Sequence, residues 1–143
     1  MRCVDVNVLV DAHRPEAAHH DTVRAWLDRA RRGPEPLGVA RQVAAGFLRV
    51  VTHPRVFREP TPPPTALAFV DALLTSPAVT PLDPGERHWA IFTGLCATLG
   101  LKGNDVPDGF LAALALEHGA TWVTSDRGFA RFPGLRLESP AGT

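Results

Sequence analysis

The sequence predicts an α/β fold in which helices flank a mostly parallel central sheet. Short runs with strand composition recur at the start of the chain and at residues 78–82, 121–124 and 135–137. Longer segments between these runs repeat apolar residues at the three- and four-residue spacing of helices. Because parallel strands need long crossover connections, strands that alternate with helices favour a helix-covered parallel sheet.

The first half of the chain is expected to contain one strand and several helical segments. The β-branched run in CVDV is typical of a central strand, and Asn7 begins an apolar turn of helix. Residues 20–32 repeat apolar side chains at helical spacing, and Gly33 follows them as a stop signal. Residues 41–52 and 65–75 show the same spacing, so we expect two further helices there.

The second half is expected to alternate strands and helices more regularly. A strand at residues 78–82 precedes a helix at residues 85–99. Pro107 suits the first turn of a helix that runs through residue 118, because the missing proline N–H has no helical partner there. A strand at residues 121–124 follows, and residues 135–137 are expected to form a last edge strand.

Length, charge and cysteine content are those of one ordinary globular domain. The chain has 143 residues, the usual size of one domain, and its formal net charge is zero. Any surface that binds nucleic acid must therefore be local. Cys3 and Cys96 lack metal-ligand spacing and are expected to be buried, reduced thiols. Since the sequence shows neither an export signal nor an apolar run of membrane-spanning length, we expect a cytoplasmic protein.

Three aspartates are the main candidates for a functional site. Asp5, Asp108 and Asp126 each lie at the end of an expected strand or the start of an expected helix. In an α/β fold such positions deliver side chains to one edge of the sheet. Carboxylates that converge there can hold Mg²⁺ or Mn²⁺, since both cations prefer oxygen ligands. The pattern indicates metal-assisted chemistry on phosphate, most simply that of a nuclease.

Each of these acids also has a structural explanation. Asp5 can cap the short helix that begins near Asn7, although we favour a functional role because a carboxylate in an apolar strand is costly to bury. Asp126 can be a turn or cap residue in the segment SDRG. Asp105 and Asp108 lie at a helix start, where the helix dipole favours acids whatever their function.

Four segments in order resemble the PIN-domain ribonucleases, and more closely the VapC-like toxins of toxin–antitoxin pairs. They are DVNVLVDAHR, GFLRVVTHPRVF, GNDVPDGFLAALALEHGA and VTSDRGFARFPGL. Each motif is weak alone, but four in the same order with similar spacing are specific. The resemblance covers nearly the whole chain, so it implies a single PIN-like domain over residues 1–143, with an acidic pocket at one end of a parallel sheet.

The resemblance also implies a chemistry, a ligand set and partners. It implies that Asp5, Asp108 and Asp126 are catalytic and bind Mg²⁺ or Mn²⁺, with Asp105 as a candidate fourth oxygen donor. Asn7 and Ser125 match polar positions that hold the carboxylates or the substrate. The implied reaction is hydrolysis of an RNA phosphodiester by a metal-activated water. Such toxins are usually homodimers, and a small VapB-like antitoxin inhibits them.

The sequence departs from the family pattern at one carboxylate. PIN domains normally supply a further Glu from the helix expected at residues 41–52, but this chain has no acid between Glu35 and Glu59. Gly46 lies about where the Glu would fall. With one anionic ligand fewer, a second metal ion should bind more weakly, which favours a single-metal mechanism.

The same acid-free segment carries four bases that are candidates for RNA contact. They are Arg41, Arg49, Arg55 and Arg58, of which we favour Arg41 and Arg49. The alternative is that these side chains lie along the helix surface or pair with acids elsewhere.

Two other functions stay open. A degenerate PIN fold that only binds a partner would agree with the missing Glu, although the three intact aspartates oppose it. A phosphatase or a flap-type DNA nuclease would use the same metal chemistry. Readings as a nucleotide-cofactor enzyme or a serine hydrolase lack support, because G-x-x-x-x-G-K-[ST], G-x-G-x-x-G and G-x-S-x-G motifs do not occur.

Overall fold

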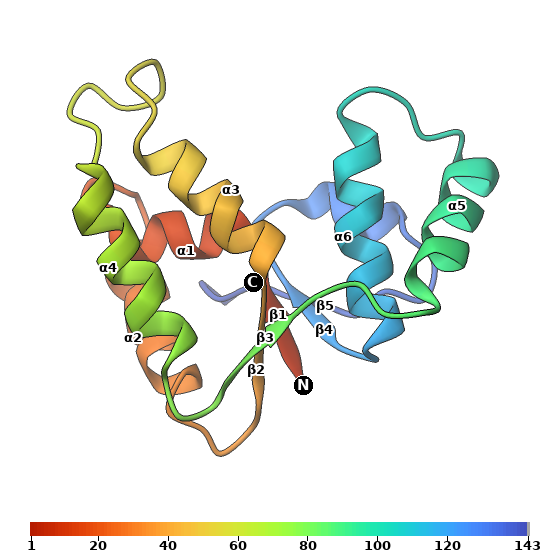
Figure 1. The fold of residues 1–143 in the computed structure, drawn as a ribbon, viewed down its shortest axis with the longest axis horizontal. Helices are drawn as coiled ribbons and strands as arrows, with labels where there is room; N and C mark the ends of the chain where they lie inside the picture. The colour runs from red at the N-terminus through yellow and green to blue at the C-terminus, as the bar shows by residue number, and fades with distance from the viewer. Residues whose placement is uncertain (143) are drawn as a thin grey trace.

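Five parallel strands form one sheet in the computed structural model, which describes residues 1–142 (Figure 1). Their order across the sheet is β3-β2-β1-β4-β5, so the first strand of the chain lies in the middle. The strands are β1 Arg2–Val4, β2 Leu37–Ala40, β3 Val79–Leu82, β4 Thr121–Val123 and β5 Leu137–Glu138. All neighbouring strands pair in parallel, which confirms the expected α/β class.

Helices pack in two groups around this sheet. The α-helices are α1 Val6–His13, α2 His20–Ala30, α3 Arg41–Val51, α4 Pro63–Leu74, α5 His88–Leu99 and α6 Asp105–Glu117, and a 3₁₀ helix η1 spans Arg127–Arg131. Helix α1 contacts α2 and α3, and α3 contacts α4, whereas α5 packs on α6. Figure 1 shows α5 and α6 on the opposite side of the strands from α2, α3 and α4.

Strand β2 is the element that the sequence analysis missed. It has only four residues, contains Gly38, and runs directly into α3 without a turn. Glycine weakens the strand signal, but a β-carbon at Gly38 would lie only 2.6 Å from Cδ1 of Leu82. A side chain at position 38 would therefore require Leu82 to shift, and all four residues of β2 are buried.

Helix α6 begins at Asp105, so Pro107 lies in its first turn as expected. The last strand is Leu137–Glu138 instead of residues 135–137, because it forms where Leu137 pairs with Trp122 of β4. No helix within residues 1–142 is both long and apolar enough to cross a membrane.

The pairing of β1 with β4 positions the candidate site. Val4 is the register partner of Val123, so the residues that follow them, Asp5 and Thr124, leave the sheet at the same edge. The backbone N–H of Asp5 donates to the carbonyl oxygen of Val123 at 2.9 Å. Two segments more than a hundred residues apart in sequence are thereby fixed side by side at the carboxyl ends of their strands.

Candidate active site

Asp5 is a buried carboxylate that accepts hydrogen bonds from three donors. It is 7% exposed and precedes the first residue of α1. Oδ1 accepts a hydrogen bond from the backbone N–H of Val6 at 2.7 Å, and Oδ2 accepts from Nδ2 of Asn7 at 3.1 Å and from Oγ1 of Thr124 at 2.7 Å. Asp5 therefore caps α1, as the structural alternative expected, and the same bonds hold its carboxylate at the sheet edge.

Thr124 is a site residue that the sequence analysis missed. Its hydroxyl donates to Asp5 and accepts from Nδ2 of Asn7 and from the backbone N–H of Asp126, each at 3.0 Å. One buried hydroxyl thus joins the turn after β1 to the turn after β4. The strand register could have found Thr124, because it directly follows the register partner of Val4.

Asn7 and Ser125, the two expected supporting residues, both lie beside Asp5, but they act differently. The amide of Asn7 bridges Asp5 and Thr124 through Nδ2, and its Oδ1 accepts from the backbone N–H of Ser125 at 3.1 Å. Ser125 is exposed, and its contact with this network is made by its backbone. The structure therefore gives Asn7 a clear positioning contact, while a role for the Ser125 hydroxyl stays a prediction.

Asp126 and Asp108 come to the same edge from two further elements. Asp126 is exposed and caps η1, with Oδ1 accepting from the backbone N–H of Gly128 at 2.8 Å. Asp108 lies in the first turn of α6, as does Asp105. Both of these acids contact Arg131, whose Nη2 lies 3.1 Å from Oδ2 of Asp108 and 3.4 Å from Oδ1 of Asp105.

The pKa of Asp5 depends on its burial, on its hydrogen bonds and on two of the other carboxylates. Burial raises the pKa of Asp5 above its ordinary value, since the apolar surroundings disfavour the charged form. Hydrogen bonds from Thr124 and Val6 lower the pKa, and the negative charges of Asp108 and Asp126 raise it further. A divalent cation near these three groups would remove the repulsion and part of the burial cost.

The donor set fits a hard divalent cation, but the carboxylates are not drawn together in the structure. Asp5, Asp108 and Asp126 offer only oxygen ligands, the type that Mg²⁺ and Mn²⁺ prefer. Within residues 1–142, no three His, Cys, Asp or Glu side chains are gathered closely enough to hold a metal ion. Shared coordination would therefore require these carboxylates to approach one another more closely.

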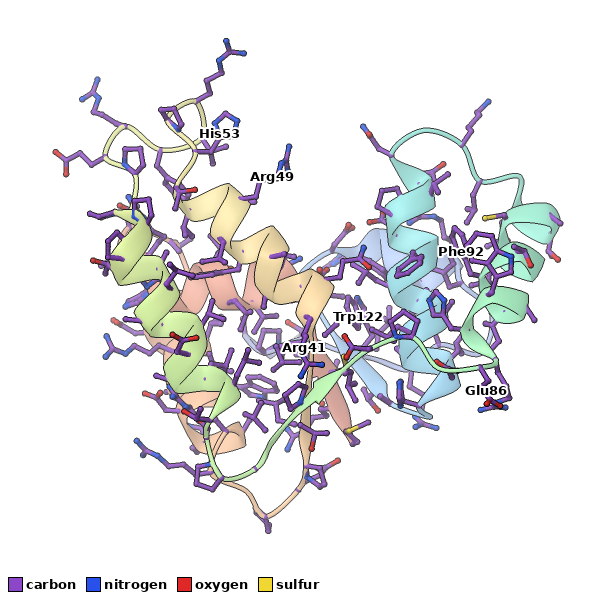
Figure 2. The ribbon with its side chains drawn as sticks, viewed as in Figure 1. Arg41, Arg49, His53, Glu86, Phe92 and Trp122 are labelled. Atoms are coloured by element: carbon purple, nitrogen blue, oxygen red, sulfur yellow. The ribbon has the colours of Figure 1, made fainter. Side chains whose placement is uncertain are left out.

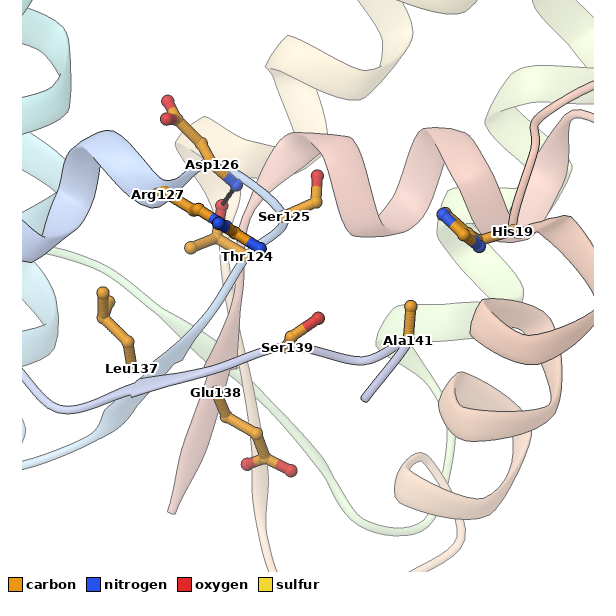
Figure 3. A pocket seen from close by; sticks show the side chains of 9 residues that line it. All are labelled: His19, Thr124, Ser125, Asp126, Arg127, Leu137, Glu138, Ser139 and Ala141. Atoms are coloured by element: carbon orange, nitrogen blue, oxygen red, sulfur yellow. Dashed lines mark hydrogen bonds between the residues drawn. The ribbon is translucent and has the colours of Figure 1, made fainter. Parts of the chain in front are cut away.

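A cavity of about 330 Å³ opens beside Asp126 (Figure 3). Its walls come from the end of β4, the C-terminal strand and tail, and the segment before α2. The residues are His19, Thr124, Ser125, Asp126, Arg127, Leu137, Glu138, Ser139 and Ala141. Figure 3 also shows the bond from the Asp126 backbone to Thr124, so the cavity directly adjoins the carboxylate network.

The two arginines proposed for RNA contact have different surroundings. Arg41 begins α3 and forms an ion pair with Asp83, so it follows the alternative of pairing with an acid. Arg49 is exposed in the last turn of α3 and points away from the core (Figure 2). Arg49 is therefore the better placed of the two for a phosphate, and RNA contact by either stays a prediction.

One family model matches the chain over almost its whole length. Its description is PIN domain, and the match covers residues 2–135.

The chain belongs to the PIN-domain family.

Its curated relatives are ribonucleases named VapC. The PIN domain is 54% identical to Ribonuclease VapC43 of Mycobacterium tuberculosis (strain ATCC 25618 / H37Rv) over 140 residues, which cover 98% of this chain and 95% of the relative. It is 42% identical to Ribonuclease VapC25 of the same strain, over 98% of this chain and 99% of the relative. These identities confirm the expected resemblance to VapC proteins, a family that generally depends on divalent metal ions.

Solved structures share the fold. A chain in the crystal structure of VapBC2 from Rickettsia felis bound to a promoter DNA fragment aligns with a TM-score of 0.72 and 20% identity, covering 96% of this chain and 97% of that one. VapC20 of Mycobacterium tuberculosis aligns with a TM-score of 0.64 and 16% identity, covering 95% and 99%. The PIN fold therefore extends over almost all of the described chain.

Gly46 has a steric role beside the start of α1. A β-carbon at Gly46 would lie 2.9 Å from Cγ2 of Val6, the residue that follows Asp5. Position 46 therefore faces the start of α1, next to the carboxylate network. In this PIN domain the space is filled by Val6, so a larger residue at position 46 would require Val6 to shift.

Proposed function

We propose that this PIN domain is a metal-dependent endoribonuclease that acts as the toxin of a type II toxin–antitoxin system. The observation that carries the proposal is the buried, fixed carboxylate of Asp5, whose pKa responds to Asp108 and Asp126. A carboxylate buried at the carboxyl ends of parallel strands is costly unless hydrogen bonds or a cation compensate it, and a cation would add to the three hydrogen bonds that Asp5 accepts. Identity of 54% to a curated ribonuclease over nearly the full chain supports the substrate class.

Asp5, Asp108 and Asp126 are the proposed metal ligands and catalytic residues, with Asp105 as a weaker candidate. Mg²⁺, or Mn²⁺ in its place, would supply charge stabilisation and a more acidic water when bound. Asp5 is the fixed member, because three hydrogen bonds hold its carboxylate. Asp126 is the exposed member and borders the cavity, so it is the carboxylate best placed to orient a water molecule or accept its proton.

The partners follow from the family and are proposals for this chain. We infer an RNA substrate and a VapB-like antitoxin encoded separately from this chain. Homodimer formation, cytoplasmic location and the extent of one domain over residues 1–143 stay predictions. The cavity beside Asp126 would hold the nucleotides next to the cleaved bond. Arg127 and His19 line this cavity.

A PIN-fold binding module without turnover is the second candidate. Two observations favour it: the chain has no acid between Glu35 and Glu59, and Arg131 contacts Asp105 and Asp108. A module of this kind would bind its partner through the same surface and need no divalent cation.

Cleavage of RNA by the purified chain distinguishes these functions. We expect structured RNAs to be cut with Mg²⁺ or Mn²⁺ and to stay intact with EDTA, while DNA of matching sequence is cut far more slowly. Because water is the proposed nucleophile, the products should carry a linear terminal phosphate and no cyclic phosphate. Asp126→Asn, which keeps the shape and cap of the side chain, should abolish the cleavage. Intact RNA under every metal condition would favour the binding module, and faster DNA cleavage would favour a DNA nuclease.

A further inference from the structure

Arg131 occupies the acidic edge together with the proposed metal ligands. It is the last residue of η1, and its Nη2 contacts Oδ2 of Asp108 at 3.1 Å and Oδ1 of Asp105 at 3.4 Å. The side chain of Arg131 is 34% exposed and that of Asp108 is 33% exposed, so the pair is only partly screened by water. Asp108 therefore already has a cationic partner supplied by its own chain.

The guanidinium group is held in place by contacts other than the acids. Its Nη1 donates to the carbonyl oxygen of Gly128, and its Cζ lies 4.6 Å from the ring centre of Phe132, which is buried. A β-carbon at Gly128 would lie 3.0 Å from Nη1 of Arg131 and also 3.0 Å from Oδ1 of Asp126. The absent side chain of Gly128 thus lets the guanidinium lie close to the turn that holds Asp126.

In this position Arg131 would compete with any cation that coordinates Asp108. An aspartate oxygen that accepts from a guanidinium at 3.1 Å loses that bond, or weakens it, when a divalent cation coordinates it. The two positive charges would also repel each other at this range. The absence of a gathered three-ligand site within residues 1–142 agrees with Arg131 holding Asp108 toward η1.

We propose that Arg131 is a positioning residue that competes with the divalent cation for Asp108 and so sets the cation affinity of the site. It keeps Asp105 and Asp108 paired while no cation is bound, and releases Asp108 when one binds. Phe132 and Gly128 then keep the guanidinium at the site edge. The inference rests on the proposed function only for the role of Asp108 as a metal ligand.

Titration with Mn²⁺ alone, without RNA, tests this competition. The variants are Arg131→Gln and Arg127→Gln, which remove the same charge from the two ends of η1. Arg127 is the matched control because it forms no ion pair within residues 1–142. We expect Arg131→Gln to bind Mn²⁺ about three- to fivefold more tightly than Arg127→Gln. This change in affinity corresponds to the interaction energy of a typical surface ion pair.

Thermal unfolding supplies a second readout that also checks folding. Arg131→Gln should unfold at a lower temperature than Arg127→Gln in EDTA, because its carboxylates lose their counter-charge, and Mn²⁺ should raise its midpoint by more. Equal or weaker Mn²⁺ binding by Arg131→Gln would overturn the competition. If the wild type still binds Mn²⁺ and cuts RNA in that case, only this inference fails; if no variant binds Mn²⁺, the proposed function fails with it.

Discussion

Asp5→Asn is expected to reduce the rate of RNA cleavage by about a hundredfold or more, because it removes a proposed anionic ligand whose interaction with a cation would be worth several kcal/mol. Asn keeps the size of the side chain, and its Oδ1 can still accept from the backbone N–H of Val6. The amide nitrogen would, however, meet two donors, Nδ2 of Asn7 and the hydroxyl of Thr124. The rate should be measured at saturating Mn²⁺ after circular dichroism has confirmed the fold. Cleavage at the wild-type rate would remove Asp5 from the site.

The same variant should also change how stability depends on pH. The pKa of Asp5 is higher in the folded chain than its ordinary value, so the folded state holds this proton more tightly than the unfolded state. Its contribution to stability is therefore greatest below the ordinary pKa and is lost as the pH rises through the raised folded pKa. Asp5→Asn should lack this loss, so its stability relative to wild type should improve across that window in EDTA. Parallel stability curves for the two proteins would contradict the assigned pKa shift.

Thr124→Val is expected to destabilise the fold by about 3 kcal/mol, because it removes three hydrogen bonds, one of them to a buried carboxylate. Valine has nearly the same shape as threonine, so packing against the strand is kept. Asp5, Asn7 and the backbone N–H of Asp126 would each lose a partner. Urea unfolding in EDTA measures the change.

Thr124→Ser is the matched control, since it keeps the hydroxyl and removes only a methyl group. It should retain most of the stability that Thr124→Val loses. The hydrogen bond from Thr124 lowers the pKa of Asp5, so Thr124→Val should also shift the acidic limb of the cleavage profile to higher pH. Equal stability of the Val and Ser variants would show that the network contributes little.

Elements with a strong periodic pattern were predictable from the sequence, and short or glycine-containing ones were not. Helices α2, α3 and α4 fall close to the expected ranges, because each buries one apolar face at helical spacing. Strand β2 escaped prediction because its buried residues number only four and include Gly38. Its burial depends on neighbours on both sides, β1 and β3, which no local window contains.

Residues of the candidate site could be picked out from the sequence where burial of their side chain is costly, and they were missed where their place depends on tertiary geometry. The acids stood out because a carboxylate next to an apolar strand needs a partner or a ligand. Thr124 did not stand out, because threonine is common at the end of a strand. Its importance comes from the register of β1 with β4. Arg131 was missed for a related reason: its contacts with Asp105 and Asp108 bridge 26 and 23 residues of sequence.

Mn²⁺ titration of the wild type and of the three variants Asp5→Asn, Asp108→Asn and Asp126→Asn tests the central claim most directly. If these carboxylates form one metal site, the wild type should bind one Mn²⁺ ion tightly, and each variant should bind it at least about tenfold more weakly, a change of about 1.4 kcal/mol. Affinities unchanged in two of the three variants would contradict a shared site, even if the chain cleaved RNA.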